Sequence, residues 1–120
     1  VIVQKADVKK ELGKQTKYGF VIEQAPACIA VFVDRTVMYN DVKDHQAMGA
    51  CIQNMLLAAH AMGLGAVWLG EILKNAEAVR TLLGLPKEME LMAVVALGHP
   101  KSQEHSSSRK AVSEVLLKEH

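Results

Sequence analysis

The stretch from Asn40 to Gly65 constrains the fold most, because it predicts one long helix with hardly any polar side. Its apolar residues recur three and four positions apart, and the remaining positions are mostly alanine and leucine. A surface helix needs one wet face, so this helix is expected to be buried on most sides. Two interpretations remain open: a helix inside one core, or a helix shared between a core and a subunit interface. The apolar stripe consists of Met48, Cys51, Ile52, Met55, Leu56, Ala59 and Met62.

Both ends of this helix carry recognisable signals. Asp41 or Asp44 is expected to cap its start, because a carboxylate there accepts hydrogen bonds from free backbone N–H groups. Gly63 or Gly65 is expected to end it in a left-handed turn. The two glycines therefore mark a helix end and not a dinucleotide-binding loop, which would follow a strand and open a helix.

Two apolar runs lack the alternation of a half-exposed strand, so both of their faces are expected to be covered by helices. These runs are Ala27 to Val33 and Leu91 to Leu97. Val1 to Val3 and Ala66 to Gly70 predict two more short extended segments. With helices between the strands, the pattern indicates a layered α/β or α+β domain. The 120 residues allow one core and are too few for two ordinary domains.

Three shorter helices are predicted beside the long one. Asp7 is expected to cap the first, with Lys9 on its solvated side. Asn75 is expected to cap the second. Residues 13–26 are expected to be an irregular connection, because glycine and proline punctuate them. The second and third of these helices are expected over residues 75–83 and 111–118.

Composition argues against several functions. A net charge of +1 gives no support for binding nucleic acid or an anionic membrane. Every apolar run is interrupted by polar residues before it reaches the length of a membrane span. Cys28 and Cys51 lie in apolar runs without metal-ligand spacing, so both are expected to be buried, unreactive thiols in a reducing cytoplasm. The five histidines also lack ligand spacing, so the sequence predicts no metal site.

The residue pattern alone indicates a fold class and no reaction, because no Ser/His/Asp or Cys/His set can be nominated from it. No catalytic residue is therefore predicted. Further information comes from four ordered blocks followed by a basic residue, Arg109, after a variable loop. Together these features resemble the nitroreductase family of FMN-dependent oxidoreductases. The blocks are residues 25–32, 53–70, 79–86 and 94–100.

The resemblance implies an α+β fold with α/β/α layers, in which helices flank a mostly antiparallel central sheet. It also implies that residues 1–120 are a single nitroreductase-like domain, equivalent to the C-terminal two-thirds of the family domain. The family's N-terminal part, with an Arg-rich helix that binds the flavin phosphate and ribityl chain, would precede Val1. The 120-residue chain by itself is therefore expected to bind FMN weakly or not at all. The family often has an acidic residue at the position of Ala47, which this chain lacks.

The function implied by the resemblance is transfer of hydride from NAD(P)H through FMN to a nitroaromatic, quinone or similar acceptor. Leu69, Gly70 and Glu71 match the segment that passes the flavin ring, and Arg109 matches a residue that meets the flavin phosphate. Gly70 could instead merely end an extended segment, and Arg109 could be a solvated loop residue. Relatives of this kind are homodimers, which here would pair through the 40–63 helix. The alternative function is a non-catalytic dimeric remnant or binding module of the same fold without flavin.

Overall fold

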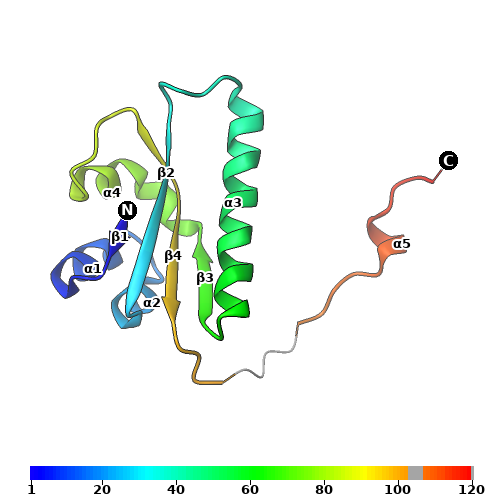
Figure 1. Ribbon diagram of the computed structural model, residues 1–120, viewed down its shortest axis with the longest axis horizontal. Coiled ribbons are helices and arrows are strands. Elements are labelled where there is room, and N and C mark those ends of the chain that lie inside the picture. The colour runs from blue at the N-terminus through cyan, green and yellow to red at the C-terminus, as the bar shows by residue number, and fades with distance from the viewer. Residues whose placement is uncertain (103–106, 120) are drawn as a thin grey trace.

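The computed structural model describes residues 1–102 and 107–119, and its main elements form three layers (Figure 1). Four antiparallel strands form one sheet in the order β1-β2-β4-β3. Helix α3 packs on one face of this sheet, and α1, α2 and α4 pack on the other. The predicted α+β, α/β/α architecture is confirmed. The elements are β1 (Ile2–Val3), α1 (Ala6–Gly13), α2 (Gly19–Gln24), β2 (Ala27–Asp34), α3 (Asp41–Ala61), β3 (Gly65–Leu69), the 3-10 helix η1 (Glu71–Asn75), α4 (Ala76–Leu82), β4 (Met89–Gly98) and α5 (Val112–Val115).

The two central strands, β2 and β4, bury side chains on both faces, as their continuous apolar sequences predict, although the face under α3 is covered less completely. Cys28 and Ala30 of β2 face α1 and α2, whereas Val31 faces α3. In β4, Val94 and Val95 are both fully buried and belong to opposite core clusters. Burying a valine side chain stabilises the folded chain by about 1.5–3 kcal/mol. These paired strands therefore form the rigid centre to which the site residues on β3 are attached.

Asp41 or Asp44 was predicted to cap the start of α3, but the capping residue is Asn40. The Asn40 side chain accepts a hydrogen bond from the Lys43 N–H at 3.0 Å. Asp44 still contributes, because its carboxylate accepts the Asn40 N–H at 2.9 Å. At the other end, Gly63 has a φ of 73° and makes the predicted left-handed turn.

The apolar stripe of α3 is only partly buried. Ile52 is fully buried and Ala59 nearly so, while Cys51 and Met62 are exposed. The prediction that both cysteines are buried is thus right for Cys28 and wrong for Cys51, because neighbouring helical residues differ in direction by about 100°. Burial raises the pKa of the Cys28 thiol, with a smaller opposing effect of Lys9.

The segment before β2 differs most from its prediction. Residues 13–26, which were expected to be irregular, contain the short helix α2. The N-cap residue of α1 is Lys5 and not the predicted Asp7. Lys9 is buried instead of solvated, because its ammonium donates to the Ala25 carbonyl at 2.5 Å. A cation at a helix C-terminus satisfies carbonyls that lack intrahelical partners. This contact joins the end of α2 to α1.

Two further helices are shorter than predicted. Asn75 does not cap α4 with its side chain, because its amide donates to the Gln15 carbonyl at 2.9 Å. A turn of 3-10 helix, η1, precedes α4 instead. The C-terminal helix is a single turn, α5, and its apolar side chains are exposed.

His45 joins the start of α3 to the start of β4 and should make stability pH-dependent. One ring nitrogen lies 2.6 Å from the Asp41 carbonyl oxygen and the other 3.3 Å from the Glu90 carboxylate, so the protonated ring satisfies both acceptors. These contacts raise the pKa of His45 above its ordinary value. Because the folded-state pKa is the higher one, the stabilisation is complete below about pH 6.5 and is lost as pH rises through the folded-state pKa. Thermal melts from roughly pH 5 to 9 should show this decline.

The His45→Gln variant should lose the decline between the same pH values, because glutamine does not titrate. Glu90→Gln should shift the decline to lower pH, since it removes the negative charge beside the ring. A wild-type melting temperature that rises steadily through this range would contradict the assignment.

Candidate functional site

The predicted flavin-contacting segment lies where β3 leaves the sheet. Leu69 is buried and pairs with Val94 of β4, whereas the next residue, Gly70, is exposed. Gly70 has φ and ψ of −92° and −23°, which any residue adopts, and a Cβ added there would meet no atom within 4 Å. Neither backbone conformation nor packing within the described chain therefore requires glycine at this position. Open space lies over its Cα, next to a strand fixed in the sheet.

The carboxylate of Glu71 points back into the protein. It accepts the Thr16 hydroxyl at 2.6 Å and the Lys17 N–H at 3.1 Å, and it forms an ion pair with Lys74. The hydrogen bond with Lys74, followed by that with Thr16, lowers the pKa of Glu71 to about 2. The group is therefore ionised at neutral pH and acts as an acceptor. It is not a proton donor for a reaction at Gly70.

Arg109 lies apart from the other three predicted site residues. It is exposed on the C-terminal segment, which extends away from the sheet (Figure 1). Its guanidinium donates to the Ser108 carbonyl at 3.2 Å. Leu69, Gly70 and Glu71 are thus brought together by the chain, whereas Arg109 is not brought beside them. Its contact with a flavin phosphate stays a prediction.

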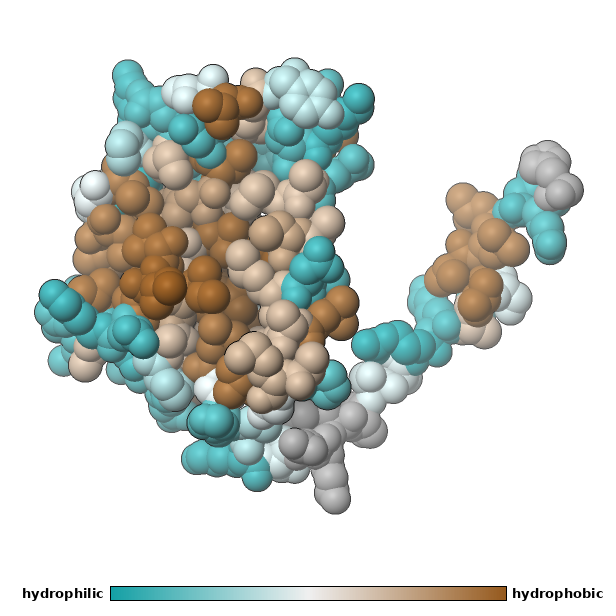
Figure 2. Space-filling view, in the orientation of Figure 1, coloured by the Kyte–Doolittle hydropathy of each residue, from teal (hydrophilic) through white to brown (hydrophobic). Residues whose placement is uncertain are grey.

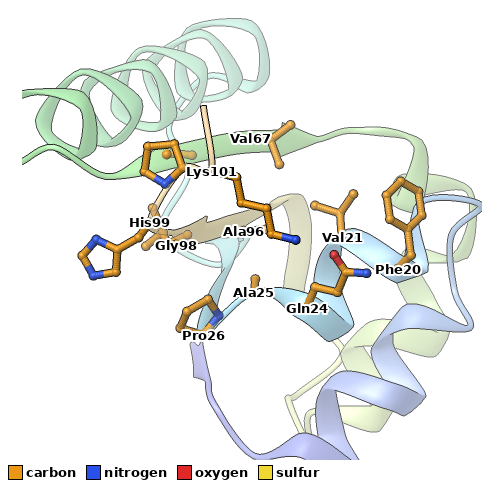
Figure 3. A pocket seen from close by; sticks show the side chains of 14 residues that line it. Phe20, Val21, Gln24, Ala25, Pro26, Val67, Ala96, Gly98, His99 and Lys101 are labelled. Carbon is orange, nitrogen blue, oxygen red and sulfur yellow. The ribbon is translucent and has the colours of Figure 1, made fainter. Parts of the chain in front are cut away.

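A groove that was not predicted lies beside the other end of β3. It has a volume of about 590 Å³ and opens between α2 and the ends of β3 and β4 (Figure 3). Phe20 and Val67 line its apolar part, and the Lys101 side chain extends over it toward Gln24. No residue of the predicted flavin set lines this groove. The sequence gives little signal for it, because its lining residues come from three separate segments.

The face of the sheet that carries α3 is incompletely covered. Figure 2 shows hydrophobic residues gathered over the strands beside α3. Ile29, Met92 and Leu97 pack against the core cluster under α3 but stay partly exposed. On α3 itself Leu57 is 57% exposed, and Trp68 of β3 is 40% exposed. An apolar area of this kind is typical of a surface that another protein element covers.

Other kinds of site are not indicated by the described residues. Among them no three His, Cys, Asp or Glu side chains are grouped so that they could hold a metal ion. No helix in residues 1–102 or 107–119 is both long and apolar enough to cross a membrane.

Comparison with known proteins identifies relatives of this chain. A protein of Archaeoglobus fulgidus classed as an NADH dehydrogenase/NAD(P)H nitroreductase is 32% identical over 106 residues, covering 86% of this chain and 61% of the relative. A solved structure from Desulfovibrio desulfuricans, classed as a nitroreductase in complex with FMN, is 47% identical with a TM-score of 0.92. The match covers 100% of this chain and 70% of that one.

A third relative is the NADPH:FMN oxidoreductase of Vibrio harveyi, solved in complex with NAD⁺. It is 26% identical with a TM-score of 0.81, and the match covers 100% of this chain and 57% of that one. The chain thus spans less than two thirds of the Archaeoglobus and Vibrio relatives. The family model described as the nitroreductase family matches residues 2–99, which include β1 to β4 and the Gly70 segment. By sequence and by fold, this chain belongs to the nitroreductase family.

Proposed function

We propose that this chain forms part of an FMN-dependent oxidoreductase that uses NAD(P)H and reduces a nitroaromatic, quinone or similar acceptor. Family membership supports the reaction class, and two of the relatives are described with FMN or as an FMN oxidoreductase. We further propose that residues 1–120 belong to one nitroreductase-like domain, equivalent to the C-terminal two-thirds of the family domain. Its two cysteines are free thiols, which suits a reducing cytoplasm.

The observation that carries this proposal is the open space over Gly70. Neither the backbone conformation nor the packing of the described residues requires glycine at position 70. A glycine there suits a position where a bound group approaches the backbone closely. Leu69 holds this backbone in place from the buried side, through its pairing in the sheet. When bound, FMN supplies the redox chemistry, accepting hydride from NAD(P)H and passing electrons to the acceptor. The chain's own task is to orient the ring and leave one side of it accessible.

Arg109 is proposed to bind the flavin phosphate, through charge-assisted hydrogen bonds from its guanidinium. Replacing Arg109 with alanine should then cost about 1.5–3 kcal/mol of binding free energy, which is roughly a ten- to hundredfold weaker affinity. FMN titrations of the oxidoreductase of which this chain is proposed to form part, with and without Arg109→Ala and followed by flavin fluorescence, measure the difference. Lys110→Ala is the matched control, because it removes an adjacent exposed positive charge. Equal affinities for wild type and Arg109→Ala would remove this residue from the site.

We also propose that the protein is a homodimer whose subunits pair through α3, the helix predicted over residues 40–63. Ala47, Ala50 and Leu57 are exposed on α3. The two alanines are small enough to let a second helix approach closely, and Leu57 adds apolar area to the same surface. The partly exposed apolar residues of the adjoining sheet face extend the same surface (Figure 2). Burying such a surface against a second copy removes apolar area from water and stabilises the pair. Trp68 at its border would supply a large contact.

A further inference from the structure

The turn between α1 and α2 is a closed and rigid unit. Gly13 and Gly19 approach so closely that a Cβ on Gly19 would lie 2.9 Å from the Gly13 carbonyl carbon. Backbone hydrogen bonds run from Thr16 N–H to the Gly13 carbonyl and from Gly19 N–H to the Thr16 carbonyl, both at 3.3 Å. The Thr16 side chain is buried at the centre, and its hydroxyl oxygen accepts the Tyr18 N–H at 3.2 Å. This turn can therefore serve as a fixed support for a neighbouring segment.

The neighbouring segment is η1, which has little stability of its own. It is one short stretch of 3-10 helix, a form with poorer hydrogen-bond geometry than an α-helix. Glu71 at its start contacts Thr16 and Lys17, and Asn75 at its end donates to the Gln15 carbonyl. Both ends of η1 are thus tied to the same turn, although the two segments are more than fifty residues apart in sequence. The tie at Glu71 lies directly beside Gly70.

We propose that the Glu71 carboxylate is a positioning group: by binding Thr16 and Lys17 of the rigid turn, it fixes the Gly70 backbone for contact with the flavin ring. This inference rests on the proposed function. Glu71 shares a peptide bond with Gly70, so holding its side chain limits rotation of the glycine, which has no side chain of its own to restrain it. The carboxylate acts through the backbone and does not itself touch the ring. The carboxylate is negatively charged at neutral pH, which strengthens its hydrogen bonds to the Thr16 hydroxyl and the Lys17 N–H.

The test replaces the hydroxyl that Glu71 binds. Thr16→Val keeps the shape of the side chain but removes its hydrogen bonds, whereas Thr16→Ser keeps the hydroxyl. Glu77→Gln is the control, because Glu77 forms a comparable ion pair with Arg80, three residues ahead, but contacts no part of the turn. Backbone amide hydrogen exchange over residues 70–73 reports directly how firmly the contacts of Glu71 restrain this backbone, and the measurement needs no flavin. FMN affinity and the midpoint potential of bound FMN report its effect on the site.

Thr16→Val should raise the exchange rates of residues 70–73 roughly tenfold, weaken FMN binding roughly three- to tenfold and shift the midpoint potential of bound FMN. Thr16→Ser and Glu77→Gln should behave as wild type. A loss of melting temperature alone would show a merely structural role, because lower stability does not change the potential of the bound group. Exchange rates that stay unchanged in Thr16→Val would overturn the positioning role. If the wild type binds FMN, a Thr16→Val variant with unchanged midpoint potential and unchanged FMN affinity would also overturn it.

Failure of the proposed function would look different. If the oxidoreductase of which this chain is proposed to form part binds no FMN, the flavin assignment is contradicted. The exchange rates would then still decide whether Glu71 holds the Gly70 backbone, since that measurement is made without flavin.

Discussion

Leu57→Glu should convert the protein from a dimer into a folded monomer. Leu57 is 57% exposed on α3, so glutamate there is solvated in the monomer and leaves its core intact. In the proposed dimer the same carboxylate would be buried without a partner, at a cost of about 3–5 kcal/mol. That corresponds to a dissociation constant more than about a hundredfold weaker. Sedimentation velocity over a concentration series measures the shift, and circular dichroism checks that the helices remain.

Leu82→Glu is the matched control, because Leu82 is an exposed leucine of α4, across the sheet from α3. It should leave the association unchanged. Met55 is a poorer test position, because it packs against the core cluster under α3 and glutamate there would disturb the monomer as well. A Leu57→Glu protein that sediments as a dimer with wild-type affinity would place the subunit interface elsewhere.

Gly19→Ala should be among the most damaging single substitutions in the chain. The added methyl group would press against the Gly13 carbonyl, and a backbone group cannot turn away as a flexible side chain does. Overpacking of this kind costs about 3 kcal/mol, which in a domain of this size lowers the melting temperature by roughly 10 °C. The strain should also loosen the turn that holds Glu71. Thermal melts and urea titrations measure the loss of stability.

Gly70→Ala makes the same chemical change where the chain leaves open space. It should melt within about 0.5 kcal/mol of wild type, as surface substitutions away from special features do. Its FMN affinity should nevertheless fall, because the methyl group would occupy the space where the ring approaches. Equal stability of the Gly19→Ala variant and wild type would contradict the close contact, and unchanged FMN affinity in Gly70→Ala would contradict the site.

Local sequence was sufficient for the parts of the fold that depend on short-range pattern. Residues 27–33 of β2 and 91–97 of β4 are continuously apolar because both strands bury side chains on each face of the sheet. The end of α3 was predictable because the left-handed turn at Gly63 needs glycine. The order of the strands in the sheet was not predictable from the residue pattern, since it depends on long-range pairing. The family resemblance implied a mostly antiparallel sheet but no strand order, which the structure gives as β1-β2-β4-β3.

The incorrect predictions concern side chains whose partners are distant in sequence. Lys9 was predicted to be solvated, but its ammonium donates a hydrogen bond to the carbonyl of Ala25, sixteen residues further along the chain. Asn75 occupies the predicted N-cap position of α4, but its side chain donates to the Gln15 carbonyl, sixty residues earlier, instead of capping the helix. Cys51 belongs to the apolar stripe and still faces outward, because α3 contacts the sheet along a narrower strip than its composition indicates. These outcomes depend on tertiary packing, which local periodicity does not contain.

The candidate site shows the same division. Resemblance to a family identified Leu69, Gly70 and Glu71 as a segment beside the flavin, whereas physical patterns alone indicated no reaction. Only the structure reveals that Gly70 lacks any neighbour that would require a glycine, and that Glu71 is tied to the Thr16 turn. The groove beside Phe20 and Lys101 was also out of reach, because its walls come together only in the folded chain.

The most direct test of the central claim is an anaerobic titration, with NADH and NADPH, of the FMN-loaded oxidoreductase of which this chain is proposed to form part. We expect FMN to remain with the protein through a desalting column, or to saturate the protein in a titration. The visible absorbance band of the bound FMN should disappear when one of the two nucleotides is added. Adding a nitroaromatic or a quinone should then restore the band. Protein that leaves FMN entirely free in solution, or bound FMN whose absorbance neither nucleotide changes, would contradict the proposed oxidoreductase function.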